Sequence, residues 1–290
     1  MKKLMKDLEF SPEDRAYLEE QRSVLKNSPS ESAFLTLAKD FMTELPDDTR
    51  PVEAALAKLA ESTGIHPYTM NLLFLLECAL PLRDAYTREG YPDSLFLETM
   101  RDLKWKLAEC KEVYGVPGNF VMFWYPGFYQ LKRFALGRLQ YELWDFPFHP
   151  CRVSGVSVRH GSRVINLHIP SCGPLTEDEW EDSLRHAMDF FSDAFPNGVF
   201  PFYMESWLLD PDLTRLLPEG NLKKFTDLFT LLNVHKFPDF PDGWRVFGKD
   251  WKLHPDLLPR RTRLQKNIAD YLARGGKLGE GFGIFIRRKA

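Results

Sequence analysis

The stretch that decides the fold of this chain is residues 164–195, VINLHIPSCGPLTEDEWEDSLRHAMDFFSDAF. It opens with alternating apolar and polar residues, which is typical of a half-buried strand. Its later apolar residues recur every three or four positions, as on one side of a helix. Ser171-Cys172-Gly173 separates the two patterns, and Thr176 and Glu179 have the spacing of a capping box. The stretch predicts a strand, a short loop and a capped helix.

A second strand is predicted to follow this helix. Pro196-Asn197-Gly198 ends the helical pattern, and Phe200–Leu209 has the composition of a strand. A strand–loop–helix–strand unit of this length is a βαβ crossover, which brings its two strands side by side in parallel. The predicted elements that follow are a helix at Leu222–Leu232, a strand near Trp244–Phe247, a helix at Arg263–Arg274 and a strand at Phe282–Arg288.

Strands are also predicted before the crossover. Gly137–Phe146 alternates, with Tyr141 on the apolar side and Glu142 on the polar side, and reads as a half-buried strand. Val153–Val158 and Val164–Ile169 flank a turn sequence and are expected to form a hairpin. The mixed α/β character therefore begins near residue 137.

The part before residue 133 has only helical signals. Proline stands at or near the expected start of several helices, as at Pro12, Pro51 and Pro67, where its missing N–H costs little. The helix from Pro67 is strongly apolar and is expected to kink or end at Pro81. We predict an α+β protein with an all-α domain over residues 1–133 and a mixed α/β domain over residues 134–290.

Composition excludes several classes of function. The 290 residues are 44% hydrophobic and 27% charged, with a formal net charge of −3, which gives no reason to expect a nucleic-acid partner or a membrane-surface partner. One local basic excess is either a solvated helix face or a site for a phosphate-bearing ligand. It comprises Arg260, Arg261, Arg263 and Lys266.

The cysteines and the apolar segments bear on metals and on location. Cys78, Cys110, Cys151 and Cys172 are scattered without a C-x-x-C pair, so no zinc site is expected. The N-terminus lacks the apolar run of a signal peptide, and Asn71–Leu82 is too short to span a bilayer. These features predict a cytoplasmic protein with reduced thiols.

Four residues near the crossover are candidates for chemistry, and no classical nucleotide or hydrolase motif accompanies them. His168 is a possible acid or base or a structural histidine. Glu205, between Tyr203 and Trp207, is either a general base with a raised pKa or a salt-bridged glutamate. Cys172 is either a nucleophile with His168 as its base or a small structural thiol.

Several segments resemble one bacterial acyltransferase family, which joins an N-acyltransferase N-terminal domain to a GNAT-like C-terminal domain. The helical region resembles the first domain. The segments that resemble the second domain are Phe134–Leu143, Asn166–Pro170, Gly173–Thr176, Ser206–Pro211, Leu258-Pro259-Arg260 and Gly275–Gly279.

The resemblance implies transfer of an acyl group from acetyl-CoA or another acyl-CoA to a small-molecule acceptor, most simply an amine, without a metal. In typical GNAT proteins the pantetheine arm lies where one strand splays from its neighbour, and the pyrophosphate meets the next helix N-terminus. The residues that this implies for cofactor binding are Asn166, Ile169, Gly173, Pro174, Leu175 and Thr176.

Strand geometry suggests the catalytic roles. Glu205 or His168 would deprotonate the acceptor, Tyr203 would protonate the leaving thiolate, and backbone N–H groups near His168–Pro170 would polarise the thioester carbonyl. Trp207, on the same side of its predicted strand, would contact the acceptor. The pyrophosphate pattern [RQ]-x-x-G-x-[GA] is absent. A non-catalytic ligand-binding protein on this fold, or a thiol enzyme using Cys172 and His168, are the alternatives.

Overall fold

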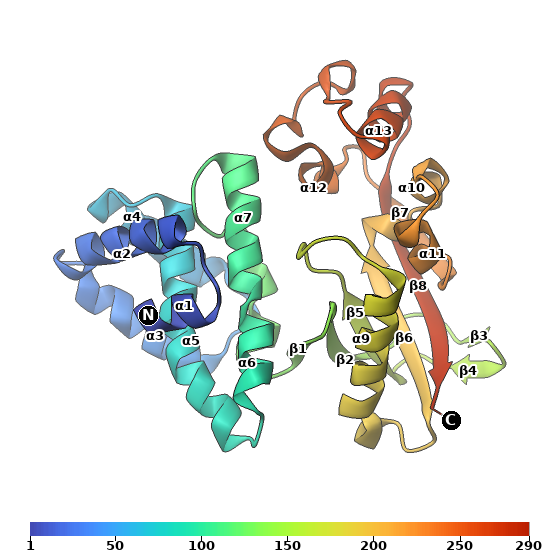
Figure 1. The fold of residues 1–290 in the computed structure, drawn as a ribbon, viewed down its shortest axis with the longest axis horizontal. Coiled ribbons are helices and arrows are strands. Elements are labelled where there is room, and N and C mark those ends of the chain that lie inside the picture. Colours follow the sequence, from blue (N-terminus) through green and yellow to red (C-terminus); the bar gives the residue numbers. More distant parts are fainter. Residues whose placement is uncertain (290) are drawn as a thin grey trace. The chain divides into compact units, whose positions relative to one another are not determined.

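The computed structural model describes residues 1–289 and divides the chain into two compact units, Met1–Ala135 and the unit that begins at Leu136. The first unit is helical, and the second contains a mixed sheet with helices (Figure 1). The predicted α+β class is confirmed. None of the helices in residues 1–289 combines the length and the apolar character that a bilayer-crossing helix needs.

The helical unit begins where the sequence predicts capped helices. Ser11 accepts a hydrogen bond from the N–H of Asp14 at 3.0 Å and places Pro12 in the first turn of its helix. The helices are α1 (Lys2–Asp7), α2 (Pro12–Lys26), α3 (Glu31–Glu44), α4 (Arg50–Thr63), α5 (Pro67–Arg88), α6 (Asp93–Met100), α7 (Asp102–Tyr114) and α8 (Pro126–Tyr129), with a 3-10 turn at Met122–Trp124.

Helix α5 is the buried centre of this unit. It runs past Pro81 to Arg88, so of the predicted kink or end at the proline, the end is wrong. Phe74 of α5 is fully buried and contacts the rings of Phe34 and Phe41 edge-on. Packing on most sides of α5 compensates for the one backbone hydrogen bond that proline removes.

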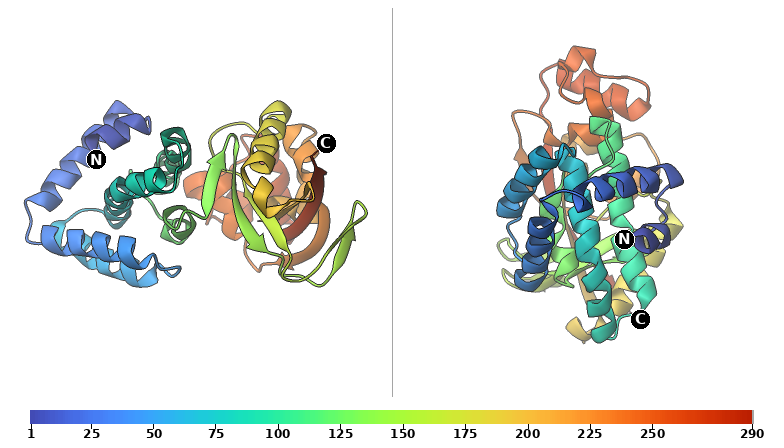
Figure 2. Two further views of the ribbon diagram at one scale, coloured as in Figure 1. Left: turned by 90° about the horizontal axis from the view of Figure 1, so that it is seen from below. Right: turned by 90° about the vertical axis from the view of Figure 1, so that its left-hand side faces the viewer.

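The chain forms a six-stranded sheet in the order β1-β2-β5-β6-β8-β7, which belongs to the second unit except for the first three residues of β1. Figure 2 shows its curvature and a separate two-stranded hairpin of β3 and β4. The strands are β1 (Arg133–Leu136), β2 (Leu139–Asp145), β3 (Cys151–Val153), β4 (Val156–Val158), β5 (Arg163–His168), β6 (Val199–Ser206), β7 (Thr230–Lys236) and β8 (Gly279–Arg288).

The predicted crossover is present. Helix α9 (Glu177–Phe190) begins at a capping box of Thr176 and Glu179, and it connects β5 to β6, which pair in parallel. It covers one face of the sheet (Figure 1). On this face Ser183 Oγ lies 2.9 Å from the Tyr141 hydroxyl. We call this side the α9 face, and it carries Tyr141, Phe202 and Phe285.

Four local predictions in this unit are wrong. Val153–Val158 does not pair with Val164–Ile169; it folds on itself as β3 and β4 around Ser154-Gly155, whose positive φ angles suit a tight turn. Strand β6 ends at Ser206, and Trp207–Leu209 is a 3-10 turn capped by the Ser206 hydroxyl. The predicted helix at Leu222–Leu232 is the shorter helix α11 (Asn221–Thr226) followed by strand β7, and Trp244–Phe247 is the helix α12.

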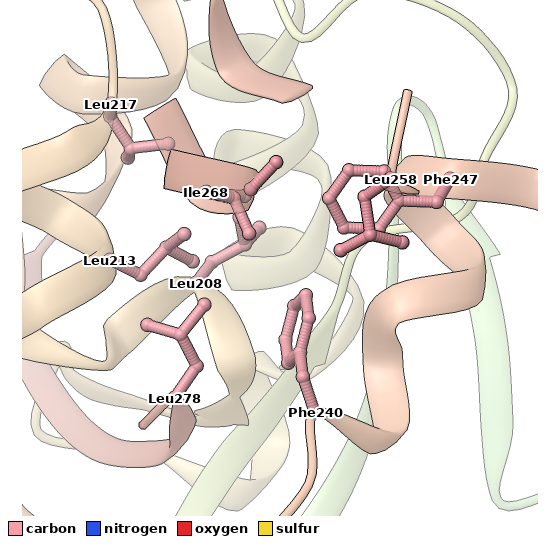
Figure 3. Close-up of a cluster of buried hydrophobic side chains, with 9 residues drawn as sticks. Leu208, Leu213, Leu217, Phe240, Phe247, Leu258, Ile268 and Leu278 are labelled. Atoms are coloured by element: carbon pink, nitrogen blue, oxygen red, sulfur yellow. The ribbon is translucent and has the colours of Figure 1, made fainter. Parts of the chain in front are cut away.

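The segment between β6 and β8 has an apolar cluster of its own. Leu208, Leu213, Phe240, Phe247 and Ile268 meet in its interior (Figure 3). The cluster joins the helices α10 (Pro211–Leu216), α11 (Asn221–Thr226), α12 (Trp244–Phe247) and α13 (Arg263–Ala273), with 3-10 turns at Pro241–Gly243, Gly248–Asp250 and Pro255–Leu257. A further 3-10 turn, Ser192–Ala194, follows α9.

Glycines let this segment approach β8 closely. A Cβ atom at Gly281 would overlap the carbonyl group of Leu209, and one at Gly279 would overlap the carbonyl of His235. Both obstacles are backbone atoms, which cannot rotate away as a side chain can. Residues 279–283, in which glycine alternates with larger residues, therefore form the first half of β8, which begins before the predicted Phe282.

We expect Gly281→Ala to lower the free energy of unfolding by at least about 3 kcal/mol, because the Leu209 backbone must move. Gly283→Ala is the matched control, since its Cβ would meet the flexible Leu209 Cδ1 at 2.8 Å and Phe229 Cβ at 3.0 Å. It should cost only about 1 kcal/mol. Urea unfolding followed by circular dichroism measures both, and equal losses would contradict the close-approach explanation.

Candidate functional site

The strand register places a row of polar side chains on the face opposite α9. Glu142 of β2 lies opposite Asn166 of β5, and Asn166 lies opposite Tyr203 of β6. Side chains two positions apart share a face, so His168 and Glu205 lie on this same face. The structure thus brings four predicted site residues to one side of the sheet, and their catalytic roles stay predictions.

The parallel pairing of β5 and β6 is short. It joins Ile165 with Phe202 and Asn166 with Tyr203, although β5 continues to His168 and β6 continues to Ser206. Beyond these positions, within the described residues, β5 pairs only with β2 and β6 pairs only with β8, so the two strands no longer pair with each other. This is the sheet feature that the sequence resemblance predicts for a pantetheine site.

Glu142 is buried at this point. The exposed fraction of its side chain is 6%, and its Oε1 atom accepts hydrogen bonds from His168 Nε2 at 2.9 Å and from Asn166 Nδ2 at 3.2 Å. The sequence placed Glu142 on the polar side of a half-buried strand, so its burial was missed. Strand β2 lies inside the sheet, and its polar side is covered where the alternation pattern suggested solvent.

Asn166 has one unsatisfied atom. Only 8% of the residue is exposed, and its Oδ1 atom is buried without a hydrogen-bond partner among residues 1–289. Buried side-chain acceptors are nearly always paired in folded proteins, because an unpaired one costs about 1–3 kcal/mol. This unpaired atom belongs to the last β5 residue that pairs with β6, and we therefore interpret it as a sign of a ligand site.

A pair of carboxyl groups lies further along the same face. Glu205 and Glu280 lie close enough to shift each other's pKa, and partial burial is the largest cause that raises the pKa of each. The interaction with Glu280 acts in the opposite direction on the pKa of Glu205, while the Glu205 charge raises the pKa of Glu280 further. Glu280 was missed because it lies before Phe282, where the sequence predicts that the strand begins.

Tyr203 lies between these groups and an apolar cluster. Only 2% of the residue is exposed, and its ring contacts Phe146 and Phe148. Burial raises the pKa of Tyr203 well above its usual value, with smaller contributions from the charges of Glu205 and Glu280. The phenol therefore keeps its proton at neutral pH and can act as a donor.

Trp207 and Ile169 lie outside the strand alternation. Trp207 follows the end of β6 in a 3-10 turn, and its ring centroid is 5.8 Å from that of Phe240. Both Trp207 and Ile169 pack against the apolar cluster between β6 and β8. The expectation that Trp207 continues the strand was therefore wrong, because Ser206 caps the turn and ends the extended backbone.

The loop before α9 is held by a residue whose role the sequence did not suggest. The guanidinium of Arg138 donates to the carbonyls of Pro170 at 3.0 Å, Gly173 at 2.6 Å and Pro174 at 3.0 Å. Thr176 donates its own N–H to the Glu179 carboxylate at 3.3 Å, and proline has no N–H. Two of the four positions from Gly173 to Thr176 thus have no N–H available for a phosphate.

The candidate nucleophile Cys172 and the basic residues Arg260 and Lys266 contact groups of the protein itself. Cys172 Sγ lies 4.0 Å from the carbonyl oxygen of Arg138. Arg260 donates to Asp270 at 3.0 Å and to the carbonyl of Leu258 at 2.9 Å, and Lys266 binds Asp270 as well. The contacts of Arg260 and Lys266 favour the reading of this basic segment as a structural and solvated surface.

Metal ligation and surface depressions do not point to a different site. Within residues 1–289, no three or more His, Cys, Asp or Glu side chains are grouped so that they could hold a metal ion. A depression on the helical unit is lined by Ser28, Ser32, Leu35 and Lys39, among others. It lies far along the chain from the polar row and contains none of the residues considered above.

The chain matches two protein-family descriptions. Residues 1–131 match the N-acyltransferase N-terminal domain, and residues 133–285 match the GNAT-like C-terminal domain. No curated protein matches the chain.

Solved acyltransferase structures have the same fold. One, in complex with decanoyl-CoA and teicoplanin, is 23% identical with a TM-score of 0.73, and the match covers 98% of this chain and 86% of that one. A mutant acyltransferase in complex with octanoyl-CoA gives the same values. An acyltransferase in complex with CoA and 10C-teicoplanin is 21% identical with a TM-score of 0.64, and 98% of each chain is covered.

At 21–23% sequence identity, the similarity to these structures establishes a shared fold. The assignment to a family rests on the two domain matches. The match to the GNAT-like domain alone spans more than half of the 290 residues. The chain belongs to the acyltransferase family that joins an N-acyltransferase N-terminal domain to a GNAT-like C-terminal domain.

Proposed function

We propose that this chain transfers an acyl group from an acyl-CoA to an amine on a small molecule. The observation that carries the proposal is the short β5–β6 pairing, which ends at Asn166 and Tyr203 while both strands continue. Backbone groups beyond that point are available to an extended ligand arm. The similar structures that contain decanoyl-CoA or octanoyl-CoA support a coenzyme A thioester as the donor.

Glu205 is the better of the two candidate bases. It retains solvent access beside the end of β6, whereas His168 Nε2 is engaged by the buried Glu142. A general base is most effective when its pKa lies near the working pH, and partial burial shifts the pKa of Glu205 in that direction. Glu205 accepts the proton that the amine loses as its nitrogen forms a bond to the thioester carbonyl carbon.

Tyr203 supplies the proton that the leaving group requires. When the tetrahedral intermediate collapses, the carbon–sulfur bond breaks and the thiolate takes a proton from the phenol, which then regains one from solvent. The raised pKa of Tyr203 keeps this proton in place beforehand and makes its transfer to a thiolate uphill, so the transfer depends on the phenol lying within hydrogen-bond reach of the sulfur. Backbone N–H groups at the end of β5 polarise the carbonyl in the same step, as fixed donors do for a developing oxyanion.

The acceptor is proposed to be an amine-bearing small molecule. The solved acyltransferase in complex with teicoplanin supports an acceptor of this kind. Ile169 and Trp207, which pack on the apolar cluster between β6 and β8, are proposed to contact the acyl chain or the acceptor. The loop Gly173–Thr176 is proposed to lie near the phosphates, with Arg138 fixing its shape.

A non-catalytic ligand-binding protein is the second candidate. The observation that favours it is the start of α9, where Thr176 N–H is already bonded to Glu179 and the first turn carries Glu177, Asp178 and Glu179. Negative charge at this helix end disfavours a pyrophosphate. Binding and turnover experiments distinguish the two candidates.

Decanoyl-CoA at 100 times its dissociation constant should raise the free energy of unfolding by about 2.7 kcal/mol, because it binds the folded chain alone. Thermal unfolding and calorimetry with decanoyl-CoA and acetyl-CoA measure the effect. Free decanoic acid is the control for non-specific binding of the alkyl chain. No heat and no stabilisation with either thioester would remove the proposed function.

Glu205→Gln should lower kcat by about 10²- to 10⁴-fold, the usual contribution of a general base. The kinetics of CoA release with hexylamine as acceptor measure it. Asp189→Asn, which removes an exposed carboxylate bound to Lys289, is the matched control and should leave kcat unchanged. If His168→Gln causes the large loss and Glu205→Gln does not, His168 is the base.

Glu205→Gln should also stabilise the fold at neutral pH. A carboxyl whose folded-state pKa is raised binds its proton more tightly in the folded state, so its contribution to stability falls as pH rises through that pKa. Above the folded-state pKa of Glu205, the Gln variant lacks the charge and therefore escapes this loss of stability. Below the unfolded-state pKa of about 4.3 the Glu205 carboxyl is protonated in both states, so the substitution changes nothing there. Melting temperatures of wild type and variant at pH 4 and pH 8 test the sign: no gain at pH 8 contradicts it.

A further inference from the structure

The buried carboxylate of Glu142 limits how its two neighbours can orient. An ionised carboxylate has only acceptor atoms, so both Asn166 and His168 must present an N–H to it. Asn166 therefore directs Nδ2 at Glu142 and its Oδ1 away from it. The same rule places the proton of His168 on Nε2 and leaves Nδ1 as the nitrogen that can accept one.

As a consequence, a buried hydrogen-bond acceptor lies at the end of the β5–β6 pairing. Asn166 is the last β5 residue in the parallel register, and its Oδ1 atom is buried and unpartnered among residues 1–289. The chain does not use the alternative orientation of the amide, in which Nδ2 would point to this place. A group with an N–H would satisfy the buried oxygen, and an oxyanion or a carbonyl would not.

We propose that Glu142 is a positioning residue that fixes the Asn166 amide so that the opened end of β5 and β6 binds an N–H donor of the substrates. The inference rests on the proposed acyl transfer and specifies the chemistry of its site. Two N–H donors are available in that reaction: an amide of the pantetheine arm and the amine of the acceptor. Glu142 itself touches neither.

Glu142→Gln removes this constraint with almost no change of shape. Asn166 and His168 both bond to the same atom, Oε1, so a Gln oxygen at that position keeps the wild-type orientation of the Asn166 amide. A Gln nitrogen there instead donates to Asn166 Oδ1 and to a His168 ring protonated on Nδ1, and the amide turns Nδ2 toward the ligand. We expect the variant to adopt this second arrangement when no ligand is bound, because it pairs the buried oxygen inside the protein. Its fold should be about as stable as wild type, while ligand binding weakens by about tenfold.

Asp145→Asn is the matched control. It removes a carboxylate from the same strand, but the Asp145 side chain is 67% exposed and pairs with Arg163 at 3.2 Å on the surface. It should alter neither binding nor kinetics. Melting temperatures of both variants separate a positioning role from structural damage, since damage lowers the melting temperature of Glu142→Gln.

Two measurements identify the N–H donor. A tenfold higher Kd of Glu142→Gln for decanoyl-CoA, measured by calorimetry, assigns the donor to the pantetheine amide. A tenfold higher KM for hexylamine with an unchanged Kd for decanoyl-CoA assigns it to the acceptor amine. Either result supports the proposal, and a variant that matches wild type in both overturns it.

The tautomer of His168 tests the same network without any ligand. Two-bond ¹H–¹⁵N correlations of the labelled wild-type protein at pH 8.5 identify which ring nitrogen carries the proton. A proton on Nε2 alone supports the role of Glu142, and a proton on Nδ1 overturns it. This result is decided whether or not wild type binds decanoyl-CoA, so a failure of the proposed function is distinguished from a failure of the inference.

Discussion

The parallel pairing of β5 with β6 is the constraint on which the second unit depends. Parallel neighbours require a crossover, and α9 supplies it while covering one face of the sheet. The pairing also fixes which side chains share the other face, because its register sets Asn166 beside Tyr203. Since the ladder covers only two positions, the same interaction that builds the sheet leaves the ends of both strands open.

The two faces of this sheet differ in chemical character. The α9 face is apolar: the rings of Phe202 and Phe285 stack at 5.1 Å, and burial of such surface stabilises the fold without specifying a ligand. The opposite face contains the buried Glu142. A buried charge adds little net stability compared with apolar packing, because the cost of desolvating it offsets what its hydrogen bonds contribute. Its retention here is consistent with a role in orienting Asn166 and His168.

The segment between β6 and β8 connects the apolar packing to the carboxyl pair. Asp210 is fully buried and accepts hydrogen bonds from the N–H of Gly279 at 2.6 Å and from Lys236 Nζ. This contact fixes the first residue of β8, and Glu280 is the second. Glycine at 279 and 281 lets the backbone of β7 and the Leu208–Leu209 turn come close enough for this arrangement. The position of Glu280 beside Glu205 thus depends on residues far away in the sequence.

The sequence alone determined the features that local chemistry controls. Capping residues and first-turn prolines located the starts of α2, α5 and α9, and apolar periodicity identified the helical unit and the crossover. The same alternation put His168 and Glu205 on the polar side of their strands. These inferences succeed because a cap or a repeat of 2 or 3.6 residues is decided by neighbours within one or two turns.

Only the tertiary structure decided which strands are neighbours in the sheet. The sequence paired β4 with β5, whereas β5 lies between β2 and β6, because a hairpin turn is local but the position of a strand in a sheet depends on long-range contacts. It read Glu142 as solvent-facing and left Glu280 outside the predicted strand Phe282–Arg288. Both are brought into the site by strands whose neighbours are distant in sequence, and no local pattern records that the polar side of a strand will be covered.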